Sequence, residues 1–159
     1  MLNFGYETIA VTHRTIKPYL RVISPEIELA NGIAMRYVFT WESDKHLWVK
    51  FFGALDGTDL NNATNDLYND FRLDSLQGVL WDFSGIDSFD VTDIHAEEVA
   101  YTDFAASHYK RNMKAAFITQ NPGFAKLAKI YIETMDDLRC PWENRLFDNI
   151  EDARMWSFG

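Results

Sequence analysis

Residues 78–111 read GVLWDFSGIDSFDVTDIHAEEVAYTDFAASHYKR and decide the fold. Val79–Phe83 is a short, nearly continuous apolar run, which is typical of a central strand that is covered on both faces. A polar turn follows, and then a long helix that Thr92 or Asp93 caps. Ala96, Ala100 and Phe104 recur at helical spacing and predict its buried stripe. We predict that this strand–turn–helix unit forms the centre of the fold and that its turn is the functional surface.

Upstream of this unit, the pattern predicts three extended runs. Asn31-Gly32 is a turn signal, and a three-residue loop at 30–32 pairs Ile27 with Met35 and places the apolar side chains on one face. We therefore expect a bulged hairpin there. Apolar residues alternate from 33 to 41, which predicts a half-buried strand, and 47–52 returns as a second strand that Gly53 closes.

Helical and extended periods alternate through the rest of the chain. A helix starts at Thr58 or Asp59, with an inward face that runs from Leu60 to Phe71. Four elements follow in order: a buried strand at 114–119, a helix that begins at Asn121-Pro122, a short strand at 145–147 and a last helix that Asn149 precedes.

From residue 33 the predicted order is β-β-α-β-α-β-α-β-α. This alternation predicts a single α/β domain over residues 33–159, with a mostly parallel sheet, an antiparallel pair at its start and about four helices. We expect residues 1–32 to be an N-terminal extension that packs on the domain, either covering a sheet edge or forming a homodimer contact.

Composition excludes several classes of partner. The formal net charge is −9 and the isoelectric point is about 4.8, so nucleic acid and anionic membrane surfaces would be repelled. Cys140 is the single cysteine, which excludes an internal disulfide and indicates a cytoplasmic protein. No apolar run approaches the roughly 20 residues that span a bilayer.

Motifs for catalysis are absent from the sequence. It contains no glycine-rich phosphate loop, and Ser84-Gly85 lacks the hydrolase elbow. His95 and Glu98 lie three residues apart, but no second cluster completes a metal site. We therefore predict no catalytic residue, metal or cofactor, and an enzyme is the last of the function classes that we consider.

From about Val38 to Trp156 the chain resembles the STAS family, in particular its SpoIIAA-like branch, which is also described as STAS/SEC14-like. The matching segments are FGAL at 52–55, VLWDFSGI at 79–86, KAAFI at 114–118, and LFD at 146–148 followed by EDA at 151–153. Their order along the chain is more specific than any one of them. The resemblance implies a non-enzymatic module that binds a protein partner or a small apolar, lipid-like ligand.

The resemblance also implies two sets of site residues. In antagonists of this family a Ser or Thr after the central strand is phosphorylated by a partner kinase, and Thr92 occupies that place, although it also reads as a helix cap. The loop around it comprises Asp87, Ser88, Asp90 and Asp93. A pocket for an apolar ligand would be lined by aromatic residues that could equally be plain core: Trp81, Phe83, Phe89, Tyr101, Phe104 and Phe124.

Overall fold

The computed structural model describes residues 27–28 and 34–159. The main domain runs β3 (Tyr37–Ser43), β4 (His46–Asp56), α1 (Gly57–Tyr68), β5 (Gly78–Asp90), α2 (Asp93–Ser107), β6 (Lys114–Ile118), α3 (Pro122–Asp137), β7 (Glu143–Phe147) and α4 (Ile150–Phe158), with a 3-10 turn, η2 (Leu73–Ser75), before β5. The five strands form one sheet in the order β3-β4-β5-β6-β7, in which β3 is antiparallel to β4 and the other neighbours are parallel. The predicted order of elements and the mixed sheet are confirmed.

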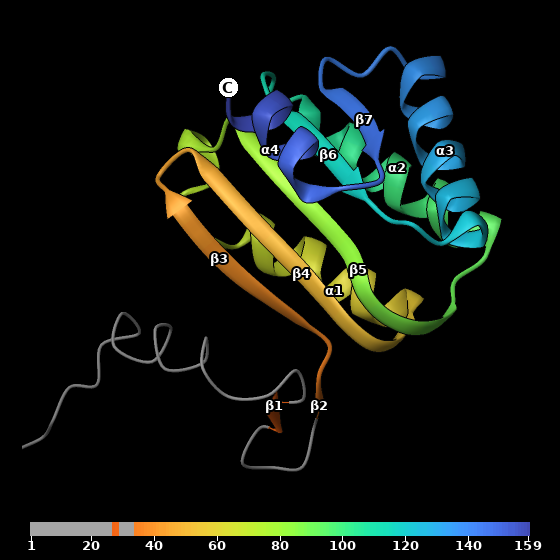
Figure 1. Cartoon of the computed structure of the whole chain (residues 1–159). Coiled ribbons are helices and arrows are strands. Elements are labelled where there is room, and N and C mark those ends of the chain that lie inside the picture. The colour runs from red at the N-terminus through yellow and green to blue at the C-terminus, as the bar shows by residue number, and fades with distance from the viewer. Residues whose placement is uncertain (1–26, 29–33) are drawn as a thin grey trace, which may run out of the picture.

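Helices cover the two faces of the sheet unequally (Figure 1). The larger core lies between the sheet and α1, α2 and α3, and is built on fully buried side chains such as Leu47, Val49 and Phe51 of β4. Alternate residues of the strands point to the other face, where α4 packs through Ala153 on Leu80 and a few neighbours. The central strand β5 is therefore buried from both sides, as its apolar run predicted.

The predicted hairpin is described only in part. β1 (Ile27–Glu28) and β2 (Ala34–Met35) pair antiparallel, with Ile27 opposite Met35, which is the predicted register. The hairpin loop and the remainder of the predicted N-terminal extension lie outside the described residues. The strand that was predicted from 33 to 41 is interrupted at Arg36, whose carbonyl oxygen accepts a hydrogen bond from the Phe52 N–H at 2.8 Å.

Both central strands are longer than predicted. Gly53 does not close β4: it takes a φ of 66°, a left-handed conformation that glycine adopts without strain, and the strand continues to Asp56. Opposite it, the expected polar turn at 84–90 is extended and pairs with β4 as far as Asp90. Because β6 ends at Ile118, opposite Asp82, this part of β5 has a ladder partner on one side only. Most of its polar side chains are consequently exposed to solvent, which is why a strand here reads as a turn.

The helix α1 ends earlier than predicted. Its last residue is Tyr68, and Asn69 terminates it by donating both its N–H and its side-chain amide to the Asn65 carbonyl oxygen. Phe71, which was predicted to face inward, is 83% exposed beneath the guanidinium group of Arg72.

Candidate functional site

Thr92 is the N-cap of α2 and is exposed. Its Oγ1 accepts a hydrogen bond from the His95 N–H at 3.4 Å, and its own N–H donates to His95 Nδ1 at 3.0 Å. The acceptor role of Nδ1 in this reciprocal cap places the proton of a neutral His95 ring on Nε2. The ring also lies over Gly57, where an added Cβ would be 2.9 Å from His95 Cδ2, so the first turns of α1 and α2 are neighbours.

The other predicted loop residues belong to the end of β5 and the start of α2. Asp87, Ser88 and Asp90 are exposed on the β5 extension, where Asp90 lies opposite Asp56 of β4. Asp93 lies 3.8 Å from the ammonium group of Lys126, in an exposed pair of the kind that contributes little to stability. These residues are exposed along the end of β5 and at the start of α2, on either side of Thr92 in the sequence.

Several of the predicted pocket residues pack on one another in the core. Phe83 and Phe124 are 5% and 4% exposed, and their ring centroids are 4.4 Å apart. Phe83 also stacks on Phe51 at 4.7 Å, and Phe89 meets Phe124 edge-on at 5.2 Å. Trp81 is half-buried, 6.2 Å from Phe51. An apolar ligand at this place would have to separate rings that are already in contact.

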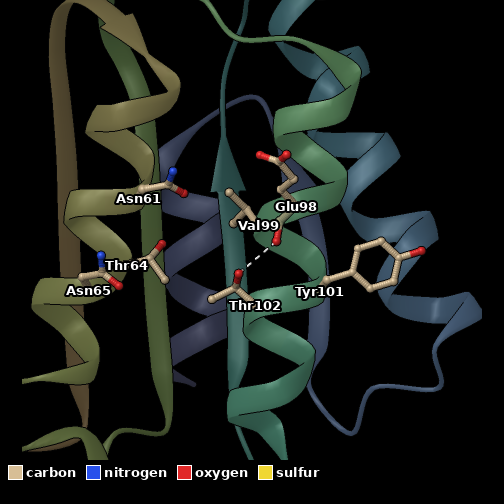
Figure 2. Close-up of a pocket in the computed structure, with 7 residues that line it drawn as sticks. All are labelled: Asn61, Thr64, Asn65, Glu98, Val99, Tyr101 and Thr102. Atoms are coloured by element: carbon tan, nitrogen blue, oxygen red, sulfur yellow. Dashed lines mark hydrogen bonds between the residues drawn. The ribbon is translucent and has the colours of Figure 1, made fainter.

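Phe104 and Tyr101, the remaining two, lie on α2. Phe104 is half-buried and edge-on to His108. Tyr101 is 55% exposed and belongs to a groove between α1 and α2, shown in Figure 2, which we call the α1–α2 groove. Its volume is about 510 Å³, and it is lined by Asn61, Thr64, Asn65, Glu98, Val99, Tyr101 and Thr102.

The lining of this groove combines polar and apolar surface, and its aromatic residue stands at the border. Asn61 and Asn65 of α1 present side-chain amides, while the Thr102 hydroxyl is turned back to the Glu98 carbonyl oxygen at 3.0 Å. The Tyr101 ring extends from α2 to the side opposite α1 (Figure 2). The groove offers hydrogen-bonding groups beside an exposed ring, which suits a peptide surface better than a lipid chain.

The outward side of α2 carries a ridge of four exposed residues, Ile94, Glu98, Tyr101 and Ala105, which we call the outer ridge. Their spacings of four, three and four residues place them on one side of the helix. Ile94 is 66% exposed, so the ridge presents two large apolar side chains to solvent. Sequence reasoning missed this ridge because it assigned only the Ala96 stripe to a face of the helix.

A buried carboxylate joins the three helices on the other side of α2. Asp103 is 6% exposed, and its two oxygens accept hydrogen bonds from the hydroxyl groups of Tyr68 on α1 and Tyr131 on α3, the latter at 2.7 Å. Burial raises the pKa of Asp103 to about 6, although the two hydroxyl donors act to lower it. The sequence did carry a signal for this burial, since Asp103 lies seven residues after Ala96 and three after Ala100 on the predicted inward stripe.

Within the described ranges, no three His, Cys, Asp or Glu side chains are grouped so that they could hold a metal ion together. Nor does that part of the chain include a helix that is both long and apolar enough to cross a membrane.

Comparison with known proteins identifies the fold. No family model matches the sequence, and no curated protein has a similar sequence. Among solved structures, the chain is similar to the anti-sigma factor antagonist SpoIIAA in its unphosphorylated form, with a TM-score of 0.51 and 9% identity over 75% of this chain and 94% of that one. It is also similar to an uncharacterized protein of the DUF3478 family with a SpoIIAA-like fold from Shewanella loihica PV-4, with a TM-score of 0.45 and 17% identity over 76% and 91% of the two chains.

The likeness to SpoIIAA, together with the strand order and the placement of the helices, shows that the chain is a SpoIIAA-like α/β domain. The fold implied by the resemblance to the STAS family is thus confirmed.

Proposed function

We propose that the protein is a non-enzymatic, cytoplasmic binding module of the STAS type, and that it binds a protein partner through the α1–α2 groove and the outer ridge of α2. One observation carries this proposal. Ile94 and Tyr101 are exposed on the same side of α2, next to a groove of about 510 Å³ whose lining includes amide and hydroxyl groups. Exposed large apolar side chains with polar groups around them are characteristic of contact surfaces between proteins.

A small apolar ligand is supported less well by the same structure. The rings of Phe83, Phe89 and Phe124 contact one another in the core, and the groove itself is lined by amide, hydroxyl and carboxylate groups. The fold agrees with a protein partner, because the similar structure of SpoIIAA is that of an anti-sigma factor antagonist. Fold similarity alone does not carry a function, so the argument depends on the surface.

Native mass spectrometry of the full chain purified from its own host tests the proposal, with the denatured mass measured on the same sample. We expect a protein-sized partner that is retained by wild type and by Met155→Ala, and lost when Ile94 and Tyr101 are both replaced by Ala. Met155 is the matched control because it is 75% exposed on α4, across the sheet. A non-covalent mass of a few hundred daltons in all three samples would contradict the proposal and favour the apolar ligand.

A second candidate function is a phosphorylation switch, and the exposure of Thr92 favours it. Its hydroxyl lies at the first turn of α2, where a phosphate would add about −1.5 to −2 charges at a helix N-terminus. The same denatured mass decides this candidate. A covalent phosphate that disappears in Thr92→Ala would support the phosphorylation switch. If the chain stays unmodified in cells in which the partner is both bound and released, the switch is contradicted.

A further inference from the structure

We infer that the segment which occupies this surface is a cationic amphipathic helix of the partner protein, lying along the outer ridge of α2. The inference rests on the proposed function and adds the chemistry of the partner. It is carried by the charges of α1 and α2, by the spacing of the exposed apolar residues, and by the exclusion of other occupants.

The charge of this surface has one sign. Neither α1 nor α2 contains a Lys or Arg, and five of their six acidic residues are at least partly exposed, Asp103 being the buried one: Asp59, Asp66, Asp93, Glu97 and Glu98. Glu98 belongs to the outer ridge and Glu97 flanks it; both are exposed and form no ion pair within the part of the chain that the structure describes. By contrast, α3 carries Lys126 and Lys129. Lys or Arg side chains on a partner would therefore meet unpaired carboxylates here.

The apolar residues of the ridge match the repeat of a helix. Ile94, Tyr101 and Ala105 lie at i, i+7 and i+11, so a partner helix running alongside α2 could contact them with residues that recur every three or four positions. The Tyr101 side chain is 55% exposed, so its ring can form a cation–π contact with an Arg or Lys of the partner. The amides of Asn61 and Asn65 in the adjacent groove can bind polar side chains of the same helix.

Other occupants fit this surface less well. A second copy of the chain would bring a surface with the same acidic side chains, Glu97 and Glu98 among them, against this one, and like charges at an interface are costly. Nucleic acid and anionic lipid are repelled by the carboxylates. A neutral apolar molecule would leave the amides and Glu98 without partners. A cationic amphipathic helix is the occupant that can pair with the carboxylates and also contact the apolar residues of the outer ridge.

The test uses the full-length chain and two designed helical peptides. Both carry Leu along one face, and the remaining positions are Lys in one peptide and Glu in the other. Amide chemical shifts of the protein are followed as each peptide is added. We expect the Lys peptide to shift α1 and α2 residues, including Asn61, Asn65, Glu98 and Tyr101, and the Glu peptide to shift none of them.

Two double variants separate a specific site from the general effect of net charge. Glu97→Lys with Glu98→Lys should weaken binding of the Lys peptide about tenfold or more, since close opposite charges become like charges. Glu133→Lys with Asp136→Lys on α3 changes the net charge by the same amount at exposed positions and should leave the affinity within about twofold. Equal weakening by both pairs, shifts that map to another face, or equal binding of the Glu peptide would overturn the inference.

The two proposals can fail separately. If the complex purified from the host is lost in the Ile94 and Tyr101 double variant but persists in Glu97→Lys with Glu98→Lys and at high salt, the surface is correct and the cationic chemistry is wrong. If the complex persists in the Ile94 and Tyr101 double variant, the proposed function itself is wrong, whichever peptide binds.

Discussion

The inner and outer faces of α2 differ in a way that a helix packed on a core does not require. The inner face buries small or polar residues: Ala96, Ala100, Asp103 and Ser107. The outer face exposes Ile94 and Tyr101. In an ordinary amphipathic surface helix the large apolar residues would be inside and the carboxylate outside. The buried carboxylate on the inner face is explained by the hydrogen bonds that join three helices. Packing within the described domain does not explain why large apolar side chains are exposed on the outer face. The partner surface that we propose would supply the explanation.

The largest effect expected on the inner face is a dependence of stability on pH. The pKa of Asp103 in the folded protein is about 6, above its usual value of 3.8, so burial favours the protonated form. The stability that Asp103 contributes is therefore fully present below about pH 4 and is lost as the pH rises through about 6. Over this range the free energy of unfolding should fall by an amount on the order of 3 kcal/mol. Asp103→Asn should remove this part of the pH profile, as measured by urea unfolding from about pH 4 to 8.

Glu98→Gln on the outer face is the control for this experiment, because it also removes one carboxylate from α2. Its profile should follow that of wild type. Profiles of wild type and Asp103→Asn that run parallel would show that the buried carboxylate does not titrate as described.

Loss of one hydroxyl group from the Asp103 network should have the next largest effect. Tyr131→Phe leaves one oxygen of a buried carboxylate without its donor, and we expect it to lower the free energy of unfolding at pH 8 by about 2 kcal/mol. Tyr101→Phe should lower the free energy of unfolding by less than about 0.5 kcal/mol, because the structure shows no hydrogen bond from the Tyr101 hydroxyl group to the described residues. Equal effects at the two positions would remove the distinction between the faces.

A change of size tests the same contrast without altering a polar group. Ala100 is fully buried, and Ala100→Leu should lower the free energy of unfolding by about 1–2 kcal/mol because the core must shift to admit the larger side chain. Ala105→Leu on the outer ridge should change it by less than about 0.5 kcal/mol. Thermal unfolding of the two variants would measure both, and a destabilised Ala105→Leu would show that the ridge is covered within the chain.

The smallest effect on stability, with the largest effect on binding, is expected at Tyr101. Tyr101→Ala should keep the free energy of unfolding within about 0.5 kcal/mol of wild type, since the ring is 55% exposed. The same variant should lose most of its partner in the purification from the host. A variant that unfolds more readily but still binds would assign Tyr101 to the fold instead of the contact surface.

The order of elements could be predicted because most of them carry local signals. The apolar run at 114–118 is buried in β6, and Asn121-Pro122 starts α3 with the expected cap, in which the Asn121 side chain accepts from the Gly123 and Phe124 N–H groups. The end of β5 could not be predicted in the same way. Residues 84–90 are mostly polar, and only their pairing with β4 beyond the left-handed Gly53 makes them a strand.

The candidate site depended still more on tertiary structure. Thr92 was correctly predicted as a helix cap from its position before the helix, and Tyr101 was singled out as an aromatic pocket residue without a signal for its direction. The groove needs Asn61 and Asn65 of α1 beside Glu98 of α2, a juxtaposition that no local pattern encodes. The partners of Asp103 are 35 and 28 residues away in the sequence, so periodicity could indicate its burial but not its hydrogen bonds.

Site-specific photocrosslinking in the host tests whether the outer ridge of α2 contacts a protein partner. A photoreactive phenylalanine analogue would replace Tyr101 on the outer ridge in one sample and Met155 on α4 in the other, since both positions are exposed. We expect a crosslink from position 101 to one defined protein, at a segment that is rich in Lys and Arg, and no such product from position 155. The same product from both positions, or none from position 101 while position 155 captures a partner, would contradict it.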